Sequence, residues 1–222
     1  MTEPPVRWPS LEHPLRLEEF RTALRDGTPV VARPVRPDDR QLIREAFERL
    51  SPESRYFRFM TPISTLTDAQ LEYLCDLDFI DHVAWVAVRE DRPAEGLGVA
   101  RYVRVEEEPG VAEAAVAVID EYHGLGLGTL LLALLAAVAR SAGISAFRAY
   151  VLRDNARMRS VLEQLGARTT SDSPGVLRMD VALDPDGLPD SVPAKVLKAA
   201  AARMVGPVRG PSLPHDANPG PT

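Results

Sequence analysis

The stretch that decides the fold is Val111–Thr129, which reads VAEAAVAVIDEYHGLGLGT. Residues 111–119 are rich in β-branched side chains, which predicts a strand. Gly124, Gly126 and Gly128 follow at alternate positions, and the apolar run after Thr129 predicts a helix. Glycines let a ligand approach the backbone closely, and the free amide groups at the start of a helix bind anions. The stretch therefore predicts a pyrophosphate site between a strand and a helix.

The common nucleotide-binding motifs do not match this turn. A Walker A loop needs Lys and then Ser or Thr after its last glycine, whereas Gly128 is followed by Thr129-Leu130. The dinucleotide fingerprint G-x-G-x-x-G fails from either starting glycine. Residues 82–90, 97–106 and 111–119 also predict three strands with connections too short for a parallel crossover, so we expect an antiparallel meander before the turn.

Hydrophobic periodicity predicts the other elements around this centre. Residues 15–24 have helical spacing, 29–36 form a strand, and helices are expected over 40–50, from Ser51 onward, and from Thr67 to Asp76. After the helix over 129–142 come a strand over 146–152, a helix over 154–165 and a last strand over 176–183. We expect an N-terminal extension over 1–28, one catalytic domain over 29–184, and a Pro/Gly-rich, largely disordered tail over 185–222 with one possible helix over 194–204.

Composition and charge exclude several classes of function. The 222 residues are 45% hydrophobic and 26% charged, with a net charge of −6, which is typical of a soluble globular protein and disfavours a nucleic-acid partner. The longest apolar run, 130–139, is far shorter than the roughly 20 residues of a membrane span, and no secretory signal is visible over 1–7. Cys75 is the only cysteine, so no intramolecular disulfide can form. We expect a cytoplasmic protein, with no membrane partner and no metal, because no Cys/His cluster has ligand spacing.

These residues resemble a known family. The order of elements and His123-x-x-Gly126-x-Gly128 at a strand-to-helix turn are similar to the GNAT acetyltransferases, whose signature is Gln or Arg followed by x-x-G-x-G or x-x-G-x-A. Asn155-Ala156-Arg157-Met158 is similar to the family's Asn-x-x-Met or Asn-x-x-Ala helix start. The resemblance covers about 30–183. It implies an α+β (α/β/α layered) fold with a mixed, mostly antiparallel sheet, splayed at its central strands, and helices on both faces.

The resemblance also implies the co-substrate acetyl-CoA. The strands over 111–119 and 146–152 would splay apart, and pantetheine would pair with the backbone of Val116, Ala117 and Val118. Asn155 would contact the pantetheine arm or orient its helix. The family's leading Gln or Arg is His123 here, whose side chain either contacts phosphate or has a capping or solvent role. The pyrophosphate would lie on the amides around the glycine turn: Gly124, Leu125, Gly126, Leu127, Gly128 and Thr129.

A closer resemblance is to the acetyltransferase domains of bacterial protein-lysine acetyltransferases. Residues 51–59, SPESRYFRF, are similar to their Ser-x-Glu-Ser-x-Tyr-x-Arg-Phe segment, and residues 112–116 to their Ala-Glu-x-Ala strand. The resemblance implies that Glu113 is the general base. Glu113 shares one strand face with alanines and an isoleucine, and apolar surroundings of that kind raise the pKa of a carboxyl. The tyrosine that many GNAT enzymes use to protonate the leaving thiolate is Leu162 here.

Two questions stay open at this point. Arg55, Tyr56 and Arg58 either line the mouth of the substrate site or form a surface face while Phe57 and Phe59 pack inside. The expected activity is direct transfer of acetyl to a primary amine in a ternary complex. The acceptor is most simply a protein lysine. The alternatives are a small-molecule amine, or a sensor that binds acetyl-CoA with little catalysis.

Overall fold

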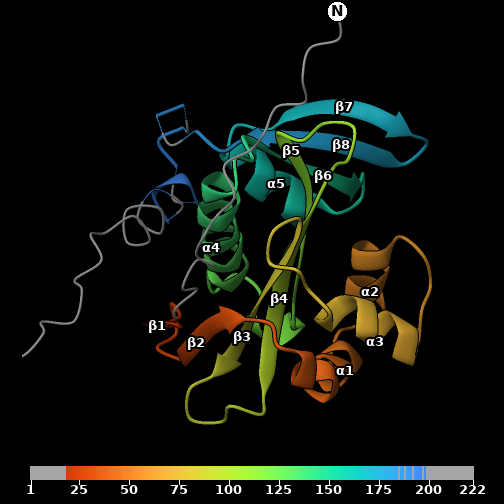
Figure 1. Ribbon diagram of the computed structural model, residues 1–222, viewed down its shortest axis with the longest axis vertical. Helices are drawn as coiled ribbons and strands as arrows, with labels where there is room; N and C mark the ends of the chain where they lie inside the picture. Colours follow the sequence, from red (N-terminus) through yellow and green to blue (C-terminus); the bar gives the residue numbers. More distant parts are fainter. Residues whose placement is uncertain (1–18, 185, 188, 192, 197, 199–222) are drawn as a thin grey trace, which may run out of the picture.

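The computed structural model describes residues 19–184, 186–187, 189–191, 193–196 and 198. Within them the chain builds one eight-stranded sheet in the order β1-β2-β3-β4-β5-β6-β8-β7 (Figure 1). The only parallel pairing in this sheet is the one between β5 and β6. The prediction of a mixed, mostly antiparallel sheet is confirmed.

The first five strands form the antiparallel part of the sheet. They are β1 (Phe20–Ala23), β2 (Pro29–Pro34), β3 (His82–Arg89), β4 (Gly96–Arg104) and β5 (Val111–Val118). The last three are the predicted meander, with Ala100 opposite both Trp85 of β3 and Val116 of β5. Their short connections leave no other arrangement, which is why the sequence alone predicted it.

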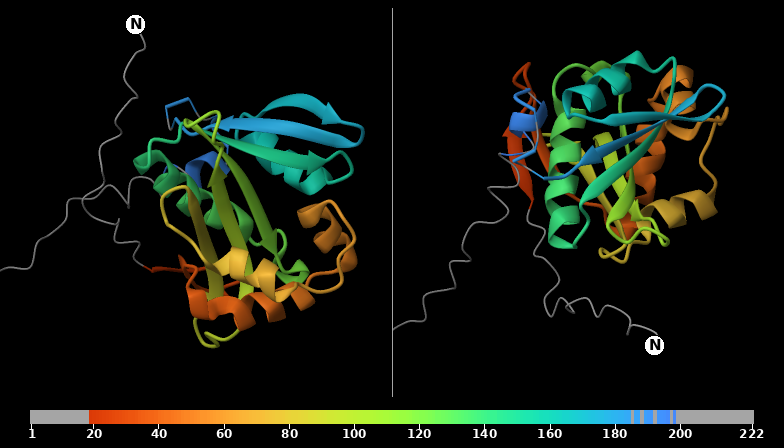
Figure 2. Two further views of the ribbon diagram at one scale, coloured as in Figure 1. Left: turned by 45° about the vertical axis from the view of Figure 1, so that its right-hand side comes forward. Right: turned by 90° about the horizontal axis from the view of Figure 1, so that it is seen from above.

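The sheet opens between its two central strands. β5 pairs with β6 (Ala146–Leu152) at only three positions, the last of them Glu113 opposite Arg148. Beyond that pair the strands diverge, as Figure 2 (left) shows. β6 stays fully paired on its other side with β8 (Val176–Ala182), which in turn pairs with β7 (Arg168–Ser173). The predicted splay is therefore present, and it exposes the backbone of β5 from Ala114 onward.

Helices cover both faces of the sheet, as predicted (Figure 2, right). One face carries α4 (Leu127–Ser141) and α5 (Ala156–Gln164), and the other carries α1 (Arg40–Glu48), α2 (Pro52–Phe59) and α3 (Asp68–Cys75). Two 3-10 turns, η1 (Pro37–Asp39) and η2 (Asp120–Tyr122), lead into α1 and toward α4. Ten of the fifteen residues of α4 are buried, which explains its nearly uninterrupted apolar sequence.

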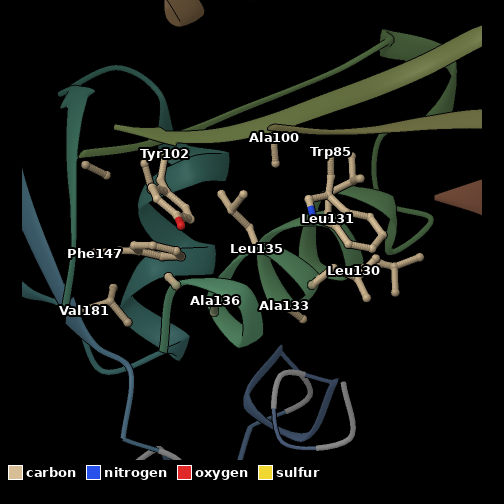
Figure 3. Packing of buried hydrophobic residues seen from close by; sticks show 14 of the residues in the cluster. Trp85, Ala100, Tyr102, Leu130, Leu131, Ala133, Leu135, Ala136, Phe147 and Val181 are labelled. Carbon is tan, nitrogen blue, oxygen red and sulfur yellow. The ribbon is translucent and has the colours of Figure 1, made fainter. Parts of the chain in front are cut away.

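The larger core lies between the sheet and α4. Trp85, Tyr102, Leu131 and Leu135 are buried there, and the ring of Tyr102 lies 6.0 Å from that of Phe147 (Figure 3). A smaller core fills the opposite face, where α1 and α3 cover the sheet. Because aromatics are few, leucine, valine and alanine supply most of both clusters. The two cores hold α4 and α2 on opposite sides of the open strands.

Two elements differ from the sequence prediction. The helical spacing over 15–24 is wrong for Phe20–Ala23, which is strand β1 and pairs with β2 through a turn containing Gly27 at φ 87°. β7 was not predicted, because all six of its residues are exposed and carry no hydrophobic alternation. The tail over 206–222 lies outside the described residues, as does most of the possible helix over 194–204. The domain limits of 29 and 184 stay a prediction, although β1 falls within the expected extension.

Candidate active site

A cavity of about 920 Å³ occupies the space that the diverging strands leave. Its volume is at the upper end of the roughly 300–1,000 Å³ typical of small-molecule sites. Val116 and Val118 of β5 line one wall, and Tyr150 of β6 lines the other. All residues predicted to bind the co-substrate line this one cavity: Val116, Ala117, Val118, His123, Gly124, Leu125, Gly126, Leu127, Gly128, Thr129 and Asn155. Their individual roles stay a prediction.

The glycine turn gives the cavity an anion-binding end. Gly124 and Gly126 have φ of 77° and 94°, a left-handed conformation that other residues adopt only with strain. Gly126 is the N-cap of α4 and has no side chain to accept a bond from the first amides of the helix. A Cβ on Gly128 would lie 3.6 Å from Cγ2 of Val118, so the helix start runs close to β5. The uncapped amides and the positive end of the helix dipole can therefore bind an anion.

Two arginines lie beside this turn that sequence reasoning had not assigned. Arg25 donates from its backbone amide to the carbonyl of Leu125 at 3.3 Å and from its side chain to that of Gly124 at 3.2 Å. Arg157 donates to Nδ1 of His123. Arg157 stood inside the Asn-x-x-Met motif and could have been noticed. Arg25 is about a hundred residues away in sequence and gave no local signal.

The side chain of His123 is hydrogen-bonded to the end of β5. Its Nε2 lies 2.8 Å from the carbonyl oxygen of Val118, to which it donates, while Nδ1 accepts from Arg157. Both ring nitrogens thereby have a partner. Asn155 is likewise a structural support, since its Oδ1 accepts from the amide of Met158 at 3.1 Å and caps α5. Of the two roles considered for Asn155, orienting the helix is thus directly visible.

The Ser-Pro-Glu-Ser segment ties α2 to the same strand end. Asp120 accepts from the amide and hydroxyl of Ser51 at 3.0 and 2.8 Å, and from the hydroxyl of Ser54 at 2.8 Å. Partial burial would raise the pKa of the Asp120 carboxyl, but these donated hydrogen bonds outweigh it and the pKa is lowered. The two serines of the resemblance therefore position α2 over the cavity.

Glu113 lies at the fork itself, as the last residue of β5 that pairs with β6. The expectation of apolar surroundings is wrong, because its side chain is exposed. Ala115 and Ala117 follow on the same strand face, but the end of the pairing leaves the carboxylate in the open. The cations whose charges act on it are Arg58 of α2 and Arg101 of β4. Glu113 stands just before Ala114, where the cavity lining of β5 begins.

The three α2 residues considered for substrate contact separate in the structure. Arg58 lines the cavity, whereas Arg55 and Tyr56 do not. Arg55 donates to the carbonyls of Glu48, Leu50 and Ser64 at 2.8–3.1 Å, so it holds the end of α1 and the loop after α2. Tyr56 is 42% exposed. Arg58 is the one of the three that faces the cleft.

A metal site and a membrane span were both expected to be absent, and only the described residues bear on these two expectations. Within those ranges no group of three or more His, Cys, Asp or Glu side chains is placed to hold a metal ion. Across the same part of the chain, every helix is too short or too polar to cross a membrane.

Comparisons with known proteins place this geometry in a family. The acetyltransferase (GNAT) domain family matches residues 30–168. Acetyltransferase PA5475 of Pseudomonas aeruginosa is 38% identical over 159 residues, covering 70% of this chain and 85% of that protein. Acetyltransferase Pat of Mycolicibacterium smegmatis is 35% identical over 174 residues, covering 77% of this chain, which spans about half (52%) of that relative.

A solved structure agrees with these relatives. The crystal structure of the GNAT domain of S. lividans PAT superposes with a TM-score of 0.69 at 31% identity, covering 74% of this chain and 96% of that one. Homologues in this family bind acetyl-CoA. The chain belongs to the GNAT acetyltransferase family and is an acyltransferase related to the Pat enzymes.

Proposed function

We propose that this enzyme transfers the acetyl group of acetyl-CoA to the side-chain amine of a protein lysine. The observation that carries the proposal is the forked sheet with Glu113 at its vertex and the glycine turn at the far end of the cavity. The relation to Pat, together with the serine pair that seats α2 on Asp120, favours a Pat-like acceptor over an unrelated amine. We infer a cytoplasmic location, because the single cysteine, Cys75, is a free thiol, which suits a reducing compartment.

The chain's residues fit the proposed co-substrate. The start of α4 offers uncapped amides and two positive-φ glycines for a diphosphate, and Arg25 and Arg157 add positive charge there. The free backbone of β5 at Val116–Val118 can pair with the amide groups of the pantetheine arm, because β6 does not occupy that edge. Acetyl-CoA supplies an activated thioester.

Glu113 is proposed as the general base. An ionised carboxylate at the mouth of the fork can take the proton of the acceptor ammonium, directly or through a water. The neutral amine then attacks the thioester carbon, and a backbone amide near Val118 stabilises the developing negative charge on oxygen. Holding both substrates in one cleft supplies much of the rate.

Protonation of the leaving thiolate requires a group other than Leu162. That residue is buried, 6% exposed, and holds no exchangeable proton. Two phenols line the cavity, Tyr122 and Tyr150. Tyr122 directs its hydroxyl toward Glu95 at 3.5 Å, whereas the hydroxyl of Tyr150 has no partner among the described residues. Tyr150 or a water beside it is therefore the proton source we propose.

The test is an acetylation survey. The purified chain is incubated with isotopically labelled acetyl-CoA and a lysate whose enzymes have been heat-inactivated, and labelled sites are found by mass spectrometry. We expect label on lysine side chains of a limited set of proteins, and at least tenfold less label with the Glu113→Gln chain. CoA release with small amines, but no labelled lysine above the level of the Glu113→Gln control, would contradict a protein acceptor.

A further inference from the structure

The face of the sheet beneath α2 and α3 holds a buried arginine without a carboxylate partner. Arg101 of β4 is 5% exposed, and its guanidinium lies 4.6 Å from the ring centroid of Tyr73. Its Nη2 has no hydrogen-bond partner within the described residues. Burial lowers the pKa of the Arg101 guanidinium. Leaving a buried donor of a charged group unpaired costs stability, so such an atom calls for an explanation.

A second arginine faces the first from α2. The guanidinium of Arg58 lies 5.0 Å from the ring centroid of Phe59, and it makes neither a hydrogen bond nor an ion pair with any described residue. Burial, and then repulsion from Arg101, lowers the pKa of Arg58 to about 10. Two like charges thus share one partly closed space, where the Glu113 carboxylate attracts both but pairs with neither, so a further anion there would stabilise the chain.

Both arginines line a small pocket of about 60 Å³ next to the main cavity. The rest of its wall is apolar, including Phe47, Leu74 and Ala117. Arg58 lines both spaces and so lies between them. At roughly 30 Å³ for one water in the liquid, the pocket has room for a group as small as a carboxylate. Two guanidinium groups are the donors that best match the planar oxygens of a carboxylate.

We propose that Arg58 and Arg101 bind a carboxylate of the acceptor molecule, next to the amine that Glu113 deprotonates. The proposal rests on the proposed function and narrows its substrate class to amines that carry a nearby acidic group. That carboxylate comes either from an acidic side chain beside the target lysine or from the backbone carboxylate of a free amino acid. Arg58 and Arg101 attract the Glu113 carboxylate without forming an ion pair with it, so Glu113 stays available for the amine.

Matched acceptors test the proposal. CoA release is measured with two pairs of acceptors. The first pair is a peptide whose lysine is flanked by Glu and the same peptide with Gln in place of Glu. The second pair is Nα-acetyl-lysine and its amide. We expect the carboxylate-bearing member of at least one pair to have a kcat/KM at least tenfold higher, mainly through KM. Preference in the peptide pair identifies an acidic side chain as the source, and preference in the other pair identifies the backbone carboxylate. Equal rates within both pairs overturn the proposal while leaving lysine acetylation intact.

Variants connect the preference to these two side chains. In Arg58→Met and Arg101→Met the preference should shrink to within twofold, whereas the exposed control Arg92→Met should keep it in full. A preference that survives in both variants overturns the assignment. Without acceptor, Arg101→Met should melt at the same temperature as the natural chain or higher, because it removes an unpaired buried charge. A melting temperature lower by several degrees would mean a structural role and would also overturn the proposal.

A binding measurement distinguishes failure of the carboxylate site from failure of the proposed function. The melting temperature is recorded with Nα-acetyl-lysine and with its amide at equal concentration. We expect a rise with the acid alone, and no rise in Arg101→Met. If no acceptor is acetylated yet this shift is found, the proposed function fails and the carboxylate site stands. If neither compound shifts the melting temperature and no preference appears in the rates, the carboxylate site fails.

Discussion

Arg33 and Arg101 make an instructive pair, because both are arginines on inner strands of the sheet and both face α1–α3. The side chain of Arg33 is 11% exposed, and its two terminal nitrogens each donate to one carboxylate oxygen of Asp39 at 2.7 Å. Arg101 is at least as buried, but it faces an aromatic ring and keeps Nη2 unpaired. The chain therefore supplies a carboxylate where an arginine supports the fold. Arg101 has no paired carboxylate, because Glu113 acts on it only through its charge, and this is where we propose that a substrate binds.

The local sequence explains the difference. Asp39 closes η1 just before α1, and it also accepts from the backbone amide of Arg36 at 2.7 Å, so the helix start fixes the carboxylate next to Arg33. The helix over Arg101 presents Tyr73 instead. An aromatic side chain attracts the cation, yet Nη2 of Arg101 still has no hydrogen-bond partner among the described residues, so this donor stays free for a ligand.

The largest effect is expected from Asp39→Asn, which breaks the ion pair between Asp39 and Arg33. Removing one partner of a buried ion pair costs about 3–5 kcal/mol, so the unfolding free energy at neutral pH should fall by that amount. Urea unfolding measures it. Arg33→Met combined with Asp39→Asn should recover part of the loss, because the unpaired charge is then gone.

The same carboxylate predicts a pH dependence. Burial would raise the pKa of Asp39, but hydrogen bonds from Arg33 and the amide of Arg36 outweigh it, and the pKa lies below the usual value of an aspartate. A lowered folded pKa stabilises the fold above the unfolded value, and this contribution is lost as the pH falls through the folded value. The difference between the natural chain and Asp39→Asn should therefore shrink below about pH 4. A constant difference would rule out the ion pair as its source.

A smaller effect, on turnover instead of folding, is expected from Glu113→Gln. Loss of a general base should lower kcat at least tenfold, about 1.4 kcal/mol or more, with acetyl-CoA affinity nearly unchanged. Melting should also change little. That result would distinguish a catalytic role of Glu113 from a role as counter-ion to Arg101. If Glu113 were a counter-ion, removing its negative charge would destabilise the fold. Glu107→Gln, a neighbouring exposed glutamate, is the matched control, and unchanged turnover in Glu113→Gln would remove Glu113 from the mechanism.

The two ends of the cleft differ in how far the sequence predicted them. The co-substrate end depends on neighbouring residues, namely Gly124, Gly126 and the cap Asn155, so spacing alone located it. Arg25 was missed because only the pairing of β1 brings it to the glycine turn. The acceptor end joins α2, α3, β4 and β5. In a strand sequence Arg101 looked like any polar residue, and its unpaired Nη2 is visible only once all the neighbouring elements are in place.

Glu113 shows the limit in the other direction. Strand alternation correctly put it on one face with Ala115 and Ala117, from which the sequence predicted apolar surroundings. Alternation says which way a side chain points, but not where the neighbouring strand departs. Because β6 leaves β5 just after this residue, the carboxylate is exposed. The resemblance named the residue, and the fork gives it access to an acceptor.

The smallest effect is expected at the opposite end of the cleft, from Gly126→Ala. A Cβ there meets only Nε of Arg25, at 3.9 Å, so the change acts through backbone strain at a φ of 94°. Left-handed alanine costs about 1–2 kcal/mol. Part of that strain should rotate the amides that hold the diphosphate and weaken acetyl-CoA binding by about threefold to tenfold. Gly175→Ala is the matched control, since its φ of 82° carries the same strain in the β7–β8 turn with nothing within 4 Å of the new Cβ.

Both variants should melt at a lower temperature, but calorimetry should find weaker acetyl-CoA binding only in Gly126→Ala. Because this turn is made of backbone and the acceptor pocket of side chains, Gly126→Ala should leave the preference for carboxylate-bearing acceptors as it was. A change in that preference would mean that the two ends are coupled through β5, and Arg101 could no longer be treated as independent of the co-substrate.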